Sequence, residues 1–410
     1  MVTQQQKDSI RFSKLNYFEA FFSSLVVGLA ETYFIAYSIH LGVSVIQSGL
    51  LASLPFLFAG IAPFLFRKIF HRFLNSSWVL IGCGVQCFAL AGLALVGVAA
   101  QNDIDAELLF YILLFLYSTY WFGYFAVQPA WNRWVSDYIN TEESGYFFAK
   151  RLRMVQWGTI LGLIVGGSLL HLKILQWPTL VVFVALFITA YHLKLISFIF
   201  YFKQPISKHN YELSWQKALH FFKTHRSFFR SYSLFNLSLY LSAPFVSGYL
   251  LSFRHITYID YMIVFAAFFF GKMSINYLLE SKKIESFKKI SPHAFFFGGG
   301  LLAAPLPFFW PLCSEVWMMS LLHFVSGVGW GFWEVGLSLS IFKNVNSHEK
   351  IEAVALYHLI GLPTQVIGGV LGALLLRYVL RDNYNMMFYI SGLLRLLLVF
   401  PLRSKKFGQV

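Results

Sequence analysis

Charged residues are scarce in this chain of 410 residues: they make up 12% of it, against about 25% in soluble proteins. Hydrophobic residues make up 58% and aromatic residues 19%. This composition excludes an ordinary soluble enzyme and predicts an integral membrane protein. Cysteine is also rare: Cys83 and Cys87 share one apolar segment and Cys313 stands alone, so no disulfide framework is predicted.

The chain also lacks the patterns that bind metals, cofactors or nucleic acids. No spacing among its His, Cys and carboxylate residues resembles a metal site, and we expect no cofactor. The net charge is +14, but the basic residues are dispersed between apolar blocks, which favours phosphate on membrane lipids over nucleic acid. No nucleophile with a base and no paired acids stand near an interface, so we expect no enzymatic activity.

Apolar runs of about 20 residues, long enough to cross a bilayer as helices, recur along the whole chain. The twelve predicted spans are 16–40, 43–66, 77–100, 107–130, 154–170, 178–202, 231–253, 257–279, 294–313, 316–342, 353–379 and 386–402. The longest loop, 203–230, separates a six-helix half at 1–202 from another at 231–410. Within this loop Trp215, Ala218, Leu219 and Phe222 recur at helical spacing, which predicts an amphipathic helix at the membrane surface.

Lys and Arg are unevenly distributed between the two sides of the predicted membrane. Of the 32, 25 lie in the tails and loops on the side of the amino terminus, and four lie in the opposite loops. Because loops rich in Lys and Arg stay in the cytoplasm, we expect both termini to be cytoplasmic in a multi-pass protein of the cell membrane. The acidic stretch Asp103, Asp105 and Glu107 then lies outside.

A weak internal repeat supports the division into halves. Gly166 and Gly167 in span five are matched about 202 positions later by Gly368 and Gly369 in span eleven. Parallel six-helix halves are a recurrent transporter architecture. The sequence therefore predicts an all-α membrane protein of twelve helices in two pseudo-symmetric halves.

One local stretch resembles a known family. Residues 129–137 (PAWNRWVSD) and 145–151 (GYFFAKR) are similar to the loop between spans four and five in bacterial members of the major facilitator superfamily of secondary transporters. The resemblance implies a monomer that alternates access to a central cavity. The family's signature between spans two and three is reduced to Arg67, Lys68 and Arg72, so its gating ion pairs are not implied.

Ionisable side chains inside spans are the first functional candidates, since each costs about 2.5–3.5 kcal/mol to insert. Glu31 lies in the middle of span one, where a carboxyl group is suited to bind and release a proton; a structural hydrogen bond is the alternative. Lys272 and Glu334 lie at similar depth, so they can form an ion pair, either coupling or static. Lys194 and Arg395 lie in spans that are peripheral in the family, so we expect them to extend toward the membrane surface.

Aromatic and small residues supply the remaining candidates. Residues that could line a cavity are Tyr33, Tyr37, Tyr120, Trp121, Trp330, Trp333 and Gln365. Core packing is the alternative for most aromatics. Glycines spaced for close helix packing are Gly158, Gly162 and Gly166 in span five, and Gly368 and Gly372 in span eleven. We expect the first group to contact span eight, by analogy with the family.

The leading hypothesis is a secondary active transporter of a small neutral, zwitterionic or amphipathic organic solute. Proton coupling runs through Glu31 or Glu334 in this hypothesis. The alternatives are an uncoupled facilitator, a lipid or drug exporter of the same fold, and a receptor or scaffold that transports nothing.

The charge asymmetry predicts the topology directly. Cysteines introduced at 282–289 should react with a membrane-impermeant reagent only from the cytoplasm, and cysteines at 103–107 only from outside, in labelling of intact cells. Labelling of 282–289 from outside would contradict the orientation.

Overall fold

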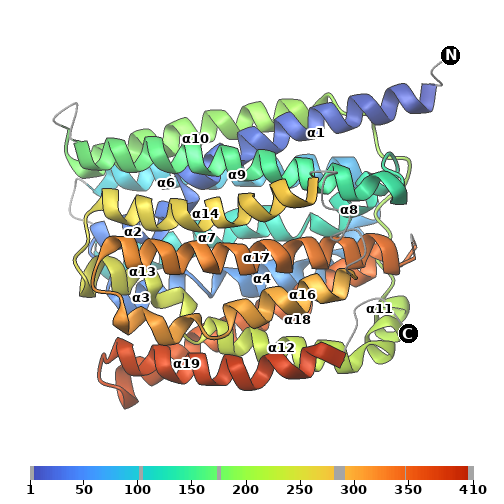
Figure 1. Cartoon of the computed structure of the whole chain (residues 1–410). Coiled ribbons are helices and arrows are strands. Elements are labelled where there is room, and N and C mark those ends of the chain that lie inside the picture. Colours follow the sequence, from blue (N-terminus) through green and yellow to red (C-terminus); the bar gives the residue numbers. More distant parts are fainter. Residues whose placement is uncertain (1–3, 101–104, 173–176, 281–290, 347, 405–410) are drawn as a thin grey trace.

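The computed structural model describes residues 4–100, 105–172, 177–280, 291–346 and 348–404, which form a bundle of long, roughly parallel helices (Figure 1). The first set of helices comprises α1 (Gln4–Leu29), η1 (Glu31–Tyr33), α2 (Phe34–His40), α3 (Val45–Leu51), α4 (Pro55–Leu65), α5 (Arg67–Phe70), α6 (Asn75–Ala99), α7 (Ala106–Phe125), α8 (Gln128–Ser136), α9 (Thr141–Leu172) and α10 (Thr179–Phe202). After α11 (Trp215–Thr224), the second set comprises α12 (Arg226–Tyr240), η3 (Ala243–Phe245), α13 (Val246–Gly248), η4 (Tyr249–Phe253), α14 (Tyr258–Glu280), α16 (Pro292–Ala303), η5 (Leu306–Leu312), α17 (Val316–Asn344), α18 (Lys350–Leu374), η6 (Leu375–Val379), α19 (Tyr384–Val399) and η7 (Phe400–Ser404).

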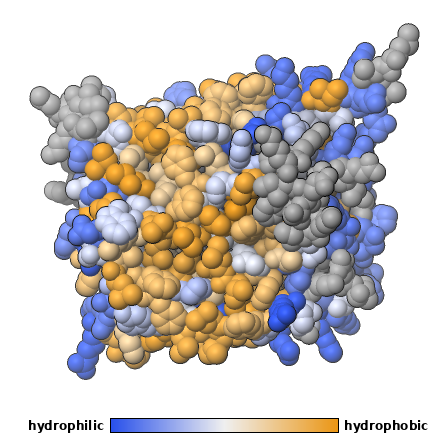
Figure 2. All heavy atoms as spheres, in the orientation of Figure 1, coloured by the Kyte–Doolittle hydropathy of each residue, from blue (hydrophilic) through white to orange (hydrophobic). Residues whose placement is uncertain are grey.

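The bundle has two ends. Helix α1 begins and η7 finishes at one of them, which we call the terminal end; α2 and α13 lie at the other, the far end (Figure 1). Apolar residues cover the middle of the visible face, and hydrophilic residues gather at both ends (Figure 2). An apolar belt between two polar ends matches a bilayer in cross-section, so the chain is a multi-pass membrane protein.

Eleven helical segments of the described chain are long and apolar enough to cross a membrane. Twelve were predicted. The predicted span 316–342 forms α17, which is 29 residues long and packs against α14 and α16. It is absent from the eleven because its Gly, Ser, Trp and Glu residues lower its hydropathy. Residues 282–289 and Asp103, on which the labelling test depends, lie outside the described residues.

The glycine ladder of α9 faces α1, so the prediction that it contacts span eight was wrong. A Cβ atom at Gly162 would lie 2.5 Å from the Leu25 carbonyl oxygen, and one at Gly166 would lie 2.9 Å from the Tyr33 ring. Gly158 faces the same helix. Small residues at this spacing allow the backbones of α9 and α1 to touch, and the sequence alone does not say which neighbour they touch.

The residue after the ladder does contact span eight. A Cβ atom at Gly167 would lie 2.6 Å from the Met262 Cβ atom of α14. In the second set, a Cβ atom at Gly369 of α18 would lie 2.6 Å from the Ser53 hydroxyl, between α3 and α4. Both glycines therefore permit close contact between the two sets.

The other glycines of α18 repeat the arrangement of the ladder. A Cβ atom at Gly368 would lie 2.7 Å from the Leu237 carbonyl oxygen of α12, and one at Gly372 would lie 2.9 Å from the Phe245 ring. Helix α18 thus packs on α12 as α9 packs on α1.

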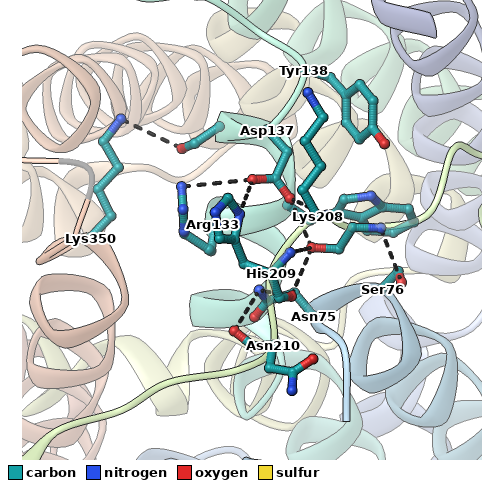
Figure 3. A network of polar contacts seen from close by, with 12 residues as sticks. Asn75, Ser76, Arg133, Asp137, Tyr138, Lys208, His209, Asn210 and Lys350 are labelled. Carbon is teal, nitrogen blue, oxygen red and sulfur yellow. Dashed lines mark hydrogen bonds and ion pairs between the residues drawn. The ribbon is translucent and has the colours of Figure 1, made fainter.

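The loop after α10 is fixed to the first set through Asp137 (Figure 3). The Asp137 carboxylate accepts hydrogen bonds from the Ser207 hydroxyl at 2.8 Å, the Lys208 backbone N–H at 2.9 Å and the His209 Nδ1 at 2.8 Å. Further on, the Tyr211 backbone N–H donates to the Phe73 carbonyl oxygen at 3.1 Å. These contacts hold residues 207–211 against the terminal end of the first set.

The same loop then turns to the second set. The Ser214 backbone N–H donates to the Glu352 carboxylate of α18 at 3.1 Å, and the Ser214 side chain caps α11. Helix α11, which lies in the predicted linker, packs on α18 through the buried Ala218 and Phe221, while the predicted Trp215 remains half exposed. Helix α12 already begins at Arg226, inside the predicted linker 203–230.

Substitution of Gly162 tests the contact between α9 and α1. Gly162→Ala should lower the free energy of unfolding by about 1–3 kcal/mol, because its Cβ atom meets backbone that cannot rotate away, and Gly162→Leu should cost more. Thermal unfolding of the purified protein measures both. The matched control is Gly84→Ala on α6, where nothing lies within 4 Å of the added atom. Equal stability of Gly162→Ala and Gly84→Ala would contradict the contact.

Candidate functional site

A cavity of about 590 Å³ lies between the two sets of helices. Residues of both sets line it, and the two sets also meet at both of its ends. At the terminal end the rings of Phe148 and Phe342 pack edge to face with centroids 4.6 Å apart. At the far end the Tyr261 hydroxyl of α14 donates to the Thr32 carbonyl oxygen at 3.2 Å. A cavity of this volume holds a drug-sized organic solute.

The predicted cavity residues divide into those that line it and those that do not. The lining includes Glu31, Trp121, Lys272, Trp330, Trp333, Glu334 and Gln365. The expectation for Tyr33 and Tyr37 has to be corrected, because both are fully buried in the core and neither lines this cavity. Their hydroxyls donate to the carbonyl oxygens of Leu163 and Leu93, at 3.1 and 3.0 Å. Backbone acceptors inside the first set hold these two rings away from the cavity.

Glu31 lies where the first span is interrupted. Helix α1 ends at Leu29, and Glu31 begins the short 3-10 turn η1 before α2. The Thr32 hydroxyl donates to the Val27 carbonyl oxygen at 2.9 Å, which satisfies an acceptor at the break. The Tyr120 hydroxyl of α7 donates to Glu31 Oε2 at 2.8 Å. The expectation that Tyr120 lines the cavity was wrong: it is buried in the core, and its hydroxyl orients the Glu31 carboxyl group.

Lys272 and Glu334 form an ion pair across the second set. Lys272 Nζ on α14 lies 2.6 Å from Glu334 Oε1 on α17. The two helices approach closely at this level, since a Cβ atom at Gly331 would lie 3.3 Å from the Lys272 Cα atom. The Glu334 side chain is 36% exposed and lines the cavity, so a solute or water there can reach it.

A second ion pair faces the cavity from the first set, and the sequence reasoning missed it. Arg151 Nη2 on α9 lies 3.2 Å from Glu19 Oε2 on α1, and its Nε donates to Asn16 Oδ1 at 2.7 Å. Arg151 was assigned to a loop because the predicted span began at residue 154, whereas α9 begins at Thr141. Glu19 lies inside the predicted span 16–40, so the criterion that selected Glu31 applies to it equally.

The expectation that Lys194 and Arg395 extend to the membrane surface was wrong. Lys194 is 3% exposed, lines the cavity and donates from Nζ to the Ser23 hydroxyl at 2.8 Å. Arg395 is buried beside the end of α12, where it donates to the Leu239 carbonyl oxygen and the Ser242 hydroxyl, at 2.8 and 2.9 Å. Both side chains turn inward, where these polar partners satisfy them.

No three His, Cys, Asp or Glu side chains converge as metal ligands in the part of the chain that the structure describes. The chemistry of the cavity therefore rests on ion pairs, on a carboxyl group held by a tyrosine, and on aromatic walls. Such groups can bind a solute and exchange a proton.

Comparison with known proteins identifies relatives of this fold. The family model of the Major Facilitator Superfamily matches residues 20–361. No curated protein matches the chain in sequence.

Solved structures similar to this one are transporters. The human organic anion transporter MFSD10 (TETRAN) has 12% sequence identity and a TM-score of 0.64, with 96% of this chain and 99% of that chain covered. A mutant of the nucleoside transporter NupG has 16% identity and a TM-score of 0.65, with the same coverage. A bacterial homologue of the iron transporter ferroportin, in an outward-facing state, has 14% identity and a TM-score of 0.62, with 95% and 98% covered.

Neutralising the pair of Lys272 and Glu334 tests its strength. Lys272→Met and Glu334→Gln should each destabilise the protein, and the double variant should cost about 1–3 kcal/mol less than the sum of the two, because no charge is left unpaired. Thermal unfolding of the four proteins measures this coupling. Arg377 and Asp382, a pair at 3.4 Å with both side chains more than half exposed, should show almost none. Additive effects of the substitutions at 272 and 334 would show that the ion pair contributes no coupling energy.

Proposed function

The chain belongs to the major facilitator superfamily, and on that premise we propose that it is a secondary active transporter of a small organic solute, with a proton as the coupling ion. The solute binds in the cavity between the two sets and is neutral, zwitterionic or amphipathic. Family and fold point to transport rather than enzymatic catalysis. The named cargoes of the similar structures are diverse, which supports an organic or ionic solute without identifying it.

The observation that carries the coupling proposal is the position of Glu31. Its carboxyl group lies in the cavity wall at the break between α1 and α2, with one oxygen held by the Tyr120 hydroxyl. The other oxygen can take a proton from the cavity. A break in the helix lets the two segments move separately, so a change in charge at Glu31 can alter the contact that Thr32 makes with Tyr261 at the far end.

We also propose that both termini lie in the cytoplasm of a monomer in the cell membrane. The halves are 1–202 and 231–410, joined by the linker 203–230. The distribution of Lys and Arg supports the orientation, and the matched glycine contacts of α9 and α18 support the division into related halves.

Glu31→Gln separates proton coupling from binding. Gln resembles the protonated carboxyl group but cannot release a proton, so the variant should still exchange solute across proteoliposome membranes while losing accumulation driven by a pH gradient. Uptake and counterflow of neutral, zwitterionic and amphipathic solutes, with and without the gradient, measure the two activities.

Tyr120→Phe is the companion variant, because it keeps the ring and removes the hydrogen bond to Glu31. It should shift the pH dependence of uptake without abolishing it. A well-folded Glu31→Gln protein that still concentrates solute against a gradient would move the coupling to Glu334. Wild-type uptake that ignores the pH gradient altogether would identify an uncoupled facilitator, and absence of all transport would favour a receptor or scaffold.

A further inference from the structure

Six acidic and basic side chains face the cavity, three of each kind, so their formal charges sum to zero. They are Glu19, Glu31, Glu334, Arg151, Lys194 and Lys272. Four of them form the two ion pairs described above. In the described part of the chain, Glu31 and Lys194 have no oppositely charged group within ion-pair distance. The carboxyl group of Glu31 and the ammonium group of Lys194 therefore lack a counter-charge from the described protein.

Lys194 of α10 and Glu31 do not pair, because Lys194 reaches the first span at a different level from Glu31. Lys194 Nζ donates to Ser23, and Glu31 lies eight residues further along the same chain segment. Eight residues of helix cover about 12 Å. The ammonium group keeps two further N–H donors, and 97% of the residue is removed from solvent, since its exposed fraction is 3%. With one hydroxyl partner and two remaining donors, this buried ammonium group would be stabilised by an anion.

Two glutamines that line the cavity have polar atoms without partners. Gln86 Nε2 and Gln156 Oε1 are buried and find no hydrogen-bond partner within the described structure, and both residues line the cavity. Cys83 lies one turn before Gln86 on α6, with its Sγ 3.8 Å from the Lys194 carbonyl oxygen. Gln86 therefore faces the same part of the cavity as Lys194. Buried polar atoms of this kind are satisfied by a ligand or by ordered water.

We propose that Lys194 and Gln86 bind the anionic group of the transported solute, and that this solute is an organic monoanion with an apolar body. The inference rests on the proposed function, since it assumes that the cavity carries a solute. Trp121 and Trp330 line the same cavity and offer aromatic faces to the apolar body. A dianion does not fit, because only one cation of the cavity lacks a carboxylate partner.

The charge balance then sets the proton count. The negative charge of the bound monoanion balances the positive charge of Lys194. The carboxylate of Glu31 is then left without a counter-charge, and one proton neutralises it. The loaded cavity therefore has no net charge. The charged and titratable groups that interact with Glu31 are Tyr120, Tyr124, Lys194 and Lys272. Tyr124 in turn interacts with Glu19, Arg151 and Glu334. Both ion pairs stay intact in this cycle. Uptake should therefore respond to a pH gradient and not to membrane potential.

Binding of two matched probes to the intact protein tests the anion subsite. The probes are 2-naphthoate and its neutral amide, titrated at pH 7 against the protein in lipid nanodiscs, with the rise in unfolding temperature as the readout. Wild type should bind the carboxylate at least about tenfold more tightly than the amide, as for a hydrogen bond to a charged group. Lys194→Met should lose this preference, and Lys194→Arg should keep it. Lys217→Met, on the exposed face of α11, is the matched control and should bind as wild type does.

Two results would overturn the subsite: a carboxylate that binds no more tightly than the amide in wild type, or a preference that survives in Lys194→Met. Transport is scored separately, with naphthalene-2-sulfonate as a monoanion that does not cross lipid unaided. Tight binding without transport in proteoliposomes would leave the subsite standing and contradict the proposed function. Transport of neutral or cationic solutes without any preference for the anion would support the proposed function and contradict the anion subsite. Uptake of the sulfonate that follows an imposed potassium diffusion potential would contradict the charge balance.

Discussion

A charge inside this bundle has to be satisfied by the protein or by what enters its cavity, because the surrounding lipid offers no partner. Two different solutions are present. Around the cavity, carboxylates and cations on neighbouring helices form ion pairs. Arg395 has no carboxylate partner among its hydrogen bonds and is held by carbonyl oxygens and hydroxyls where α12 ends. The last carbonyl groups of a helix carry partial negative charge, so a guanidinium group can be stabilised there by dipoles alone. Two ion pairs thus line the cavity beside the unpaired Glu31 and Lys194, and the dipole-bound charge lies at a helix break outside it.

The adjacent glycines explain how α9 and α18 each serve two neighbours at once. Successive residues of a helix point about 100° apart, so a pair such as Gly166 and Gly167 opens two different faces. One face receives a helix of the same set and the other a helix of the opposite set. Gly368 and Gly369 do the same on α18. Because the pattern recurs in both sets, α9 and α18 each touch the opposite set through the second glycine of the pair.

The sequence predicted the helical membrane fold because apolar length is a local property that needs no knowledge of neighbours. It also selected Glu31 and the pair of Lys272 and Glu334, since a charge within an apolar run stands out. The direction of a side chain is not local. Lys194 was assigned to the membrane surface although it turns inward, and Gln86 was not selected because an uncharged amide in an apolar run attracts little attention. Which helix a glycine face meets depends on the whole packing, and the pattern alone could not supply it.

The loop between the sets has a geometric consequence for any movement between them. Only Glu212 and Leu213 separate Tyr211, bound to the first set, from Ser214, bound to α18 of the second. An extended chain covers about 3.3–3.6 Å per residue, so the Cα atoms of Tyr211 and Ser214 can separate by no more than about 11 Å while both bonds hold. While both bonds hold, the length of this segment limits how far the two sets of helices can move apart at the terminal end. In the proposed transport cycle, the amplitude of opening then depends on this linker, whereas solute binding depends on the cavity.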